Sequence, residues 1–506
     1  MVAAGILLSR IIGLVRNRVF AHYFGTSDAA DAFNAAFRIP NFLQNLFGEG
    51  VLSASFIPVY ARLRAHDRAR DAAATAAAVA ALLGLTVSLL VLAGTLLAPW
   101  LIELIAPGFE GEKRAATTRL VRILFPGAGL LVLSAWCLGV LNSHRRFFLP
   151  YVAPVVWNLA IIVALVGSGN GTGQYALAEI AAWGSVVGSL LQFGVQLPSV
   201  LGLLGGLRPG PLLAEPVRTV IHNFGPVFVG RGVVQISAYV DTLLASLLPT
   251  GAVAAVSYAQ VLYTLPVSLF GMSVSAAELP EMSSATGTAA ERATYLRGRL
   301  EAGLRQIAFF VVPSAAAFVA LGDVVAGALY QSGEFTREMT LYVWGILAAA
   351  SLGLLPSTLG RLYSSAFYAL HDTRTPLRIA LVRVSLGILL GYGLALHLPQ
   401  LFGVGPRWGA AGITLASALA AGVEYLLLRR SLGKRIGVTR LAWDVLGRTW
   451  AATVLAAGMA LLLRVLLPPL HPIPAAVLVL GAFGAVYLGT GALLGLPQAR
   501  RLLRLG

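Results

Sequence analysis

Residues 73–99 read AATAAAVAALLGLTVSLLVLAGTLLAP and contain no charged side chain. A helix that crosses the hydrocarbon core of a bilayer needs about 20 consecutive, predominantly apolar residues. This run is longer than that minimum, so it predicts a membrane-spanning helix.

Similar runs, bounded by Gly, Pro or charged residues, recur along the whole chain and predict about fourteen spans. The predicted spans are 3–23, 28–48, 73–99, 118–141, 150–168, 176–204, 218–248, 252–279, 304–329, 340–368, 376–397, 408–429, 442–467 and 474–495. We interpret 51–63 as a continuation of the second span after a break at Gly48-Glu49-Gly50. The sequence therefore predicts an all-α polytopic membrane protein.

Composition supports this fold class. Of 506 residues, 58% are hydrophobic and 11% are charged, whereas about a quarter of a soluble chain is charged. This excludes a large extramembrane catalytic domain. The net charge of +16 would suggest nucleic acid in a soluble protein. Here the charges lie in short loops and inside apolar runs, so we expect membrane lipid as the partner and no nucleic acid.

The basic residues are concentrated in alternate loops, which predicts an even number of spans with both termini in the cytoplasm. The first run carries three arginines and no small-residue cleavage site, so we expect a mature helix there and not a removed signal peptide. The segment 53–58, SASFIP, resembles 275–280, SAAELP. If this is a repeat and not coincidence, it predicts an N-terminal lobe over 1–207, a second six-helix lobe over 208–430 and two additional helices in 431–506. In transporters built from repeats the substrate site lies between the lobes.

Ten arginines lie inside apolar runs, where a guanidinium is costly unless it faces water, a counter-charge or a ligand. They are Arg10, Arg16, Arg18, Arg38, Arg122, Arg231, Arg361, Arg383, Arg448 and Arg464. Arg18, Arg122, Arg448 and Arg464 lie near predicted span ends, and we interpret these four as reaching the interface.

Polar residues gather on one side of the first predicted helix. Ser9, Arg10, Gly13, Arg16 and Asn17 fall within an arc of about 120° at 100° per residue. This arc predicts a cavity in which Gly13 lets a ligand approach the backbone and the two arginines bind phosphate oxygens.

The second predicted helix has a narrower polar stripe of about 80°. Its members are Asp31, Asn34, Arg38, Asn41 and Asn45. A closed interhelical network without a ligand is the alternative, but the excess of cations over anions favours an anionic ligand. We expect helix breaks or gating positions at Gly13, Pro40, Glu49 and Gly50.

In the seventh predicted span, Arg231 shares a stripe with Gln235 and Thr242, so it is a candidate substrate-binding residue from the second lobe. Asp241 is either a coupling-ion or proton site or the counter-charge of an arginine. No metal-ligand cluster and no H-E-x-x-H, G-x-S-x-G or phosphate-binding loop is present in the sequence. We therefore expect a transporter and not an enzyme, without a cofactor, driven by a sodium or proton gradient or by the membrane potential.

Ordered motifs then suggest a family. These are Ser9-Arg10 with Gly13 and Arg16, Asp31-Ala32-Phe33, Arg38-Ile39-Pro40-Asn41, Glu49-Gly50, Phe56-Ile57-Pro58, Leu141-Asn142-Ser143 through Phe147, Pro150, Pro154 and Asn158, and Asp372-Thr373-Arg374-Thr375-Pro376. Over essentially its whole length the sequence resembles the MurJ (MviN) family of lipid II flippases, in the superfamily that also contains multidrug extruders and polysaccharide flippases.

The resemblance implies movement of undecaprenyl-pyrophosphate carrying a disaccharide-pentapeptide across a bacterial inner membrane by alternating access, with cell-wall synthesis proteins as further partners. Arg10, Arg16 and Asp31 match family positions required for flipping. Two family arginines are replaced, by Gln44 and Val261, and we infer that Arg231 or Arg38 compensates. The alternatives are a flippase for another lipid-linked oligosaccharide and a non-transporting cell-wall scaffold.

Overall fold

The computed structural model describes residues 2–401, 403–439 and 441–504, and within these ranges it describes the side chains of all but 2–4, 49, 226–238, 398 and 504. The described elements are helices. In bilayers a helix satisfies its own backbone hydrogen bonds, which is why apolar runs of this length adopt it.

The chain divides into two compact units, Met1–Val253 with Ser332–Phe335, and Ala254–Gln331 with Thr336–Gly506. We name these unit 1 and unit 2. The lobe boundary that we predicted near residue 207 does not coincide with this division and stays a prediction.

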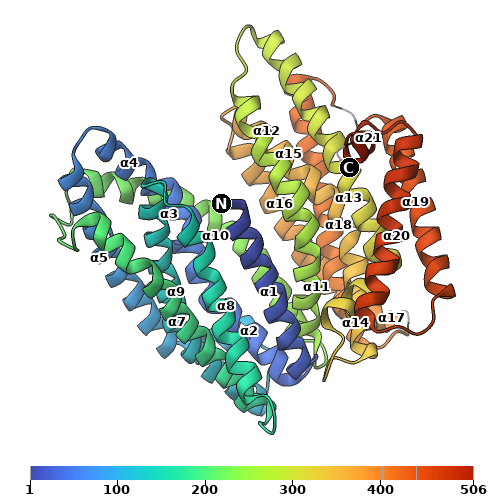
Figure 1. The fold of residues 1–506 in the computed structure, drawn as a ribbon, viewed down its shortest axis with the longest axis horizontal. Helices are drawn as coiled ribbons and strands as arrows, with labels where there is room; N and C mark the ends of the chain where they lie inside the picture. The colour runs from blue at the N-terminus through green and yellow to red at the C-terminus, as the bar shows by residue number, and fades with distance from the viewer. Residues whose placement is uncertain (1, 402, 440, 505–506) are drawn as a thin grey trace. The chain divides into compact units, whose positions relative to one another are not determined.

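Unit 1 is a bundle in which α7 contacts α9, α2 and α5, while α8 contacts α1 and α9 (Figure 1). In its core, the indole nitrogen of Trp136 on α7 donates to the carbonyl oxygen of Ala76 on α5 at 3.1 Å. The helices of this part of the chain are α1 (Val2–Phe24), α2 (Asp28–Phe47), α3 (Glu49–Ser55), α4 (Ile57–Ala65), α5 (Ala69–Leu96), α6 (Ala98–Ile105), α7 (Gly111–Ser143), α8 (Phe148–Ser168), α9 (Gln174–Leu204) and α10 (Glu215–Ser246).

In unit 2, α18 packs against α14, α15 and α16, and α13 packs against α14, α15 and α19. The π-helical segment η1 joins α11 to α12 within one predicted span. The helices that follow α10 are α11 (Ala252–Pro266), η1 (Val267–Met272), α12 (Ser273–Ser283), α13 (Ala289–Tyr330), α14 (Arg337–Ser351), α15 (Leu354–Ala369), α16 (Arg374–Tyr392), η2 (Gly393–His397), α17 (Leu398–Leu401), η3 (Pro406–Trp408), α18 (Gly409–Ile436), α19 (Trp443–Leu466), α20 (Pro472–Leu493) and α21 (Pro497–Arg504).

Helices occupy all fourteen ranges in which we predicted spans. Among the described residues, ten helices are long and apolar enough to cross a membrane, and the pair α14 and α15, bent by 43°, raises this to eleven if it is one span. The helices α1, α2 and α10 are not among them, and α1 carries three arginines. The fold is therefore confirmed as all-helical and polytopic, while the count of fourteen spans stays a prediction.

Helix breaks occur at only some of the positions where we predicted them. The helix α1 runs unbroken through Gly13 and α2 through Pro40, so neither residue breaks its helix here. The break after α2 lies at Gly48, where a Cβ atom would stand 2.1 Å from the carbonyl oxygen of Gln44. Glu49 and Gly50 begin α3. Of the three residues at which we predicted the break, only Gly48 therefore lies outside a helix. The gating roles of Gly13, Pro40, Glu49 and Gly50 stay predictions.

Candidate functional site

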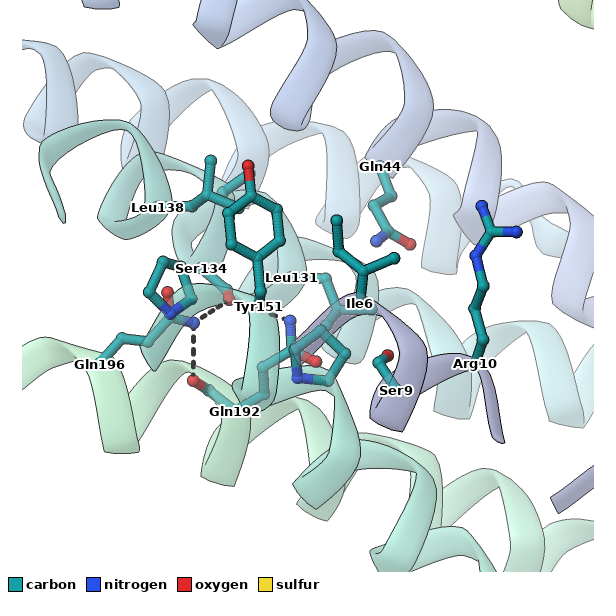
Figure 2. Close-up of a pocket in the computed structure, with 13 residues that line it drawn as sticks. Ile6, Ser9, Arg10, Gln44, Leu131, Ser134, Leu138, Tyr151, Gln192 and Gln196 are labelled. Carbon is teal, nitrogen blue, oxygen red and sulfur yellow. Dashed lines mark hydrogen bonds between the residues drawn. The ribbon is translucent and has the colours of Figure 1, made fainter. Parts of the chain in front are cut away.

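A cavity of about 360 Å³ lies within unit 1, and its walls come from α1, α2, α7, α8 and α9 (Figure 2). Its lining residues are Ile6, Ser9, Arg10, Gln44, Leu131, Ser134, Ala135, Leu138, Pro150, Tyr151, Pro154, Gln192 and Gln196. Ser9 and Arg10 thus line a cavity with partly polar walls, whereas Gly13, Arg16 and Asn17 of the same predicted arc do not line it. Gln44, which stands where the resemblance implies an arginine, lines the same cavity as Arg10.

Arg16 lies further along α1 and is not part of this lining. Its guanidinium donates to Asn17 Oδ1 at 2.8 Å and stands 4.9 Å from the ring centre of Trp157 on α8. A cation over an indole face is stabilised by the ring quadrupole. The structure therefore places Arg10 and Arg16 on one helix in different surroundings, and their substrate-binding roles stay predictions.

Three polar side chains form a hydrogen-bonded group at the cavity, which we name the amide group: Ser134, Gln192 and Gln196. Both glutamine side chains donate to Ser134 Oγ, at 3.1 Å from Gln192 and 2.6 Å from Gln196. Sequence reasoning missed them because it searched for charged stripes. The available signal was a pair of glutamines one helical turn apart inside an otherwise apolar span.

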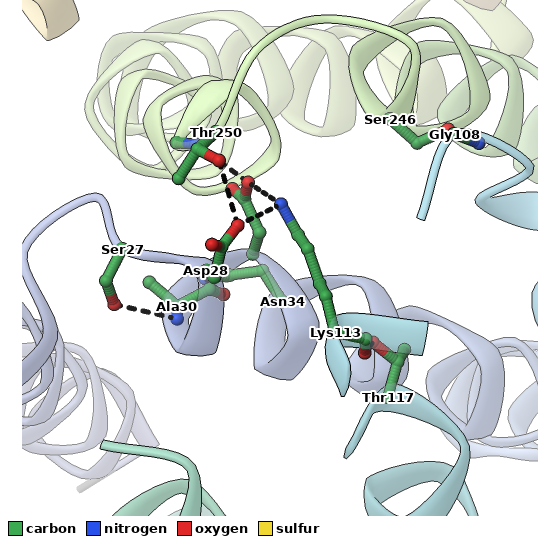
Figure 3. Close-up of polar contacts among 11 residues, drawn as sticks. Ser27, Asp28, Ala30, Asn34, Gly108, Lys113, Thr117, Ser246 and Thr250 are labelled. Carbon is green, nitrogen blue, oxygen red and sulfur yellow. Dashed lines mark hydrogen bonds and ion pairs between the residues drawn. The ribbon is translucent and has the colours of Figure 1, made fainter. Parts of the chain in front are cut away.

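Asp31 on α2 is 1% exposed and takes part in a second polar cluster, at the N-terminal end of α2 (Figure 3). Lys113 at the start of α7 contacts Asp31 at 2.7 Å and Asp28 at 2.8 Å. Further contacts come from the connection after α10, where the Gly251 backbone N–H donates to Asp31 at 2.7 Å and the Thr250 hydroxyl to Asp28 at 2.9 Å. The two carboxylates of α2 thus join α7 and the connection after α10.

Arg38 lies on the same helix, and the hydroxyl of Tyr239 on α10 donates to its carbonyl oxygen at 3.1 Å. Neither Arg38 nor Asn41 lines the unit 1 cavity. Their roles in binding, and the ion-coupling role of Asp241, stay predictions.

The side chains of Arg231 and Gln235 lie outside the described residues, as does that of Glu49. The contribution of Arg231 to substrate binding therefore stays a prediction.

Unit 2 holds a buried carboxylate with two arginine partners. Asp323 on α13 is 1% exposed, accepts two hydrogen bonds from Arg464 at 2.8 and 3.0 Å, and contacts Arg337 at 2.5 Å. Arg464 thus makes a specific ion pair, which our interface interpretation of this residue did not include. Arg383 on α16 pairs similarly with Glu424 on α18 at 2.9 Å.

A family model described as lipid II flippase MurJ matches residues 20–475. The chain is 32% identical to the lipid II flippase MurJ of Burkholderia cenocepacia, over 85% of this chain and 82% of that protein. It is 31% identical to the probable lipid II flippase MurJ of Rhizobium tropici, over 90% of this chain and 84% of that protein.

Solved structures share the fold. A lipid II flippase MurJ in an inward closed conformation superimposes with a TM-score of 0.78 at 24% identity, over 99% of both chains. An inward-facing multidrug resistance MATE family transporter of the MOP superfamily gives a TM-score of 0.65 at 17% identity, over 84% of this chain and 95% of that one. At these identities the likeness concerns the fold alone.

Proposed function

Because the chain belongs to the MurJ family of lipid II flippases, we propose that it moves the lipid-linked peptidoglycan precursor from the inner to the outer leaflet of a bacterial inner membrane. The precursor carries a diphosphate between an apolar lipid and a hydrophilic headgroup. Its transporter therefore needs cationic and polar groups at membrane depth, where such groups are otherwise costly.

The observation that carries the proposal is the unit 1 cavity, in which Arg10 lines one space with the amide group and Gln44. A planar guanidinium offers paired donors that match phosphate oxygens. A non-transporting scaffold has no need of a polar cavity inside apolar helices, so the cavity disfavours that alternative.

We extend the proposal to topology and motion. In this proposal the chain crosses the membrane fourteen times and both termini lie in the cytoplasm. The lobes 1–207 and 208–430 move by alternating access, and 431–506 forms two additional helices. Support comes from helices in all fourteen predicted ranges and from the basic residues in alternate loops. Cysteine labelling of residues near 208 and 290 from each side of the membrane tests the orientation.

One observation favours a second candidate, a flippase for a different lipid-linked oligosaccharide. Gln44 lines the cavity beside Arg10 at a position where the resembled family has an arginine, and Val261 replaces another. Fewer cations suit a headgroup with less negative charge, because each lost guanidinium removes a charge-assisted bond to an anion.

The experiment is a flipping assay in vesicles that contain the purified full chain. Defined substrates are the peptidoglycan precursor, a lipid-linked oligosaccharide without the peptide, and a phospholipid as the negative control. Each is measured with and without a membrane potential and with a sodium or proton gradient. Preferential movement of the peptide-bearing precursor supports the proposal. Preference for the oligosaccharide supports the second candidate, and movement of neither contradicts both.

A further inference from the structure

The amide group lies in the hydrophobic part of unit 1. Ser134 belongs to α7, and Gln192 and Gln196 belong to α9, and both helices are long and apolar enough to cross a membrane. Gln196 is 1% exposed and Ser134 3% exposed. Polar side chains at this depth are costly, and they commonly mark a binding site or a pathway.

The hydrogen bonds within the amide group leave it incomplete. A hydroxyl has two acceptor lone pairs and one donor hydrogen. The amide nitrogens of Gln192 and Gln196 occupy both lone pairs of Ser134 Oγ, so the Ser134 hydrogen is left to donate. The side-chain oxygen of Gln196 is buried and has no hydrogen-bond partner among the described residues. The Ser134 hydroxyl therefore still needs an acceptor, and Gln196 Oε1 still needs a donor. An incoming molecule can supply both.

The cavity size limits what that molecule is. Pockets for small molecules commonly measure about 300–1,000 Å³, and a cavity of about 360 Å³ is at the small end of this range, which suits a single sugar better than a whole disaccharide-peptide. Arg10 lines the same cavity (Figure 2). If Arg10 binds a phosphate oxygen, the group that reaches Ser134 and Gln196 is bonded close to that phosphate.

We infer that the amide group is a subsite for an uncharged, amide- and hydroxyl-bearing sugar that is attached directly to the diphosphate of the transported lipid. A sugar hydroxyl or amide N–H donates to Gln196 Oε1, and a sugar oxygen accepts from the Ser134 hydroxyl. The inference rests on the proposed function and adds to it the headgroup feature that unit 1 recognises.

The test measures binding of three lipids to the purified full chain in detergent. They are undecaprenyl diphosphate, the same lipid with one acetamido sugar, and the complete peptide-bearing precursor. One net hydrogen bond is worth about tenfold or less in affinity. We expect the single sugar to tighten binding about tenfold in the unmodified protein.

Ser134→Ala and Gln196→Leu should reduce that gain to less than about twofold. The gain is the ratio of two affinities measured on the same variant, so it is corrected for any change in binding of undecaprenyl diphosphate itself. Ser189→Ala is the matched control, because its buried hydroxyl lies on α9, donates to the carbonyl oxygen of Ser185 at 2.8 Å and does not line the cavity. Thermal unfolding checks that each variant is folded. If Gln196→Leu fails to fold, Gln192→Ala removes a less buried member of the group and should also lower the gain.

Equal binding of the sugar-free and single-sugar lipids by the unmodified protein would overturn the inference and leave the proposed function standing. A gain that only the peptide-bearing precursor produces would also overturn it. If none of the three lipids binds, the inference and the proposed function fail together.

Discussion

The two units each contain a cavity of similar volume, about 360 Å³ in unit 1 and 390 Å³ in unit 2, with different linings. One arginine, three glutamines and two serines line the first together with apolar residues. Leucine, proline and phenylalanine dominate the second, and the hydroxyl of its Tyr487 is already bonded to the carbonyl oxygen of Phe309. Volume alone therefore does not indicate function. We expect substitutions at the unit 1 cavity to lower transport, and substitutions in unit 2 to lower stability.

The largest effect is expected at a buried charge of unit 2. Asp323→Ala leaves Arg337 and Arg464, whose side chains are 47% and 37% exposed, without their shared carboxylate, and each lost hydrogen bond to a charged group contributes about 1.5–3 kcal/mol. Thermal unfolding in detergent should show a large decrease in stability, with transport per folded molecule retained. Asp444→Ala, at an exposed pair with Arg448, is the control and should change little. A fully stable Asp323→Ala variant would refute the structural role.

Next comes the polar cavity itself. Arg10→Ala should lower the flipping rate about 10- to 100-fold, because hydrogen bonds to charged groups contribute about 1.5–3 kcal/mol. Arg10→Lys should restore part of this rate, since the charge returns without the planar fork. Unfolding temperatures of both variants separate a loss of transport from a loss of stability. Normal transport by Arg10→Ala would contradict the expectation that the unit 1 cavity serves transport.

The Lys113 cluster shows whether unit 1 also contains polar groups with a purely structural role. Asp31→Asn should cost about 1.5 kcal/mol, because it removes the charge from a buried carboxylate bonded to Lys113 and Gly251. Asp28→Asn should cost less, since its side chain is 46% exposed and exposed pairs contribute little. Comparing stability with flipping rate separates the two roles. Slow flipping by a stable Asp31→Asn variant would indicate a direct role in transport.

A smaller effect is expected at the unit 2 cavity. Phe310 stacks on Phe270 of η1 with ring centres 4.5 Å apart, and such a pair contributes about 1 kcal/mol beyond its buried area. Phe310→Leu should therefore lower the unfolding temperature slightly and leave transport per molecule unchanged. If transport falls instead while stability holds, the apolar cavity also serves the substrate.

The smallest effect concerns pH at the surface of unit 2. Hydrogen bonds from the hydroxyl and backbone N–H of Thr375, together with Arg435, lower the pKa of Asp372 from 3.8 to about 2. The folded state thus favours the ionised carboxylate, so its contribution is present above pH 4 and is lost as the pH falls from about 4 to 2. The difference in unfolding free energy between the unmodified protein and Asp372→Asn should be smaller at pH 3 than at pH 5. A constant difference would contradict this.

Sequence alone predicted the helical fold, because apolar runs and loop charges report directly on a bilayer environment. It also grouped Ser9 and Arg10 on one side of α1, and both line the unit 1 cavity, while Gly13, Arg16 and Asn17 of the same arc do not. It did not find the amide group, because Ser134 and Gln196 lie on different helices and only packing brings them together. The contact between Asp31 and Lys113 was also missed, because the two residues are 82 positions apart in the chain and only packing brings them together.

Two glycines of the N-terminal helices differ in how freely they can change. At Gly13 an added Cβ would meet only Asn158 Oδ1, at 3.9 Å, whereas at Gly48 it would stand 2.1 Å from the carbonyl oxygen of Gln44. In a saturation library selected for growth, position 13 should therefore tolerate alanine while position 48 retains glycine. A variant with another residue at position 48 would have to shift Gln44, which also lines the cavity. We therefore expect altered substrate preference to arise first among such variants.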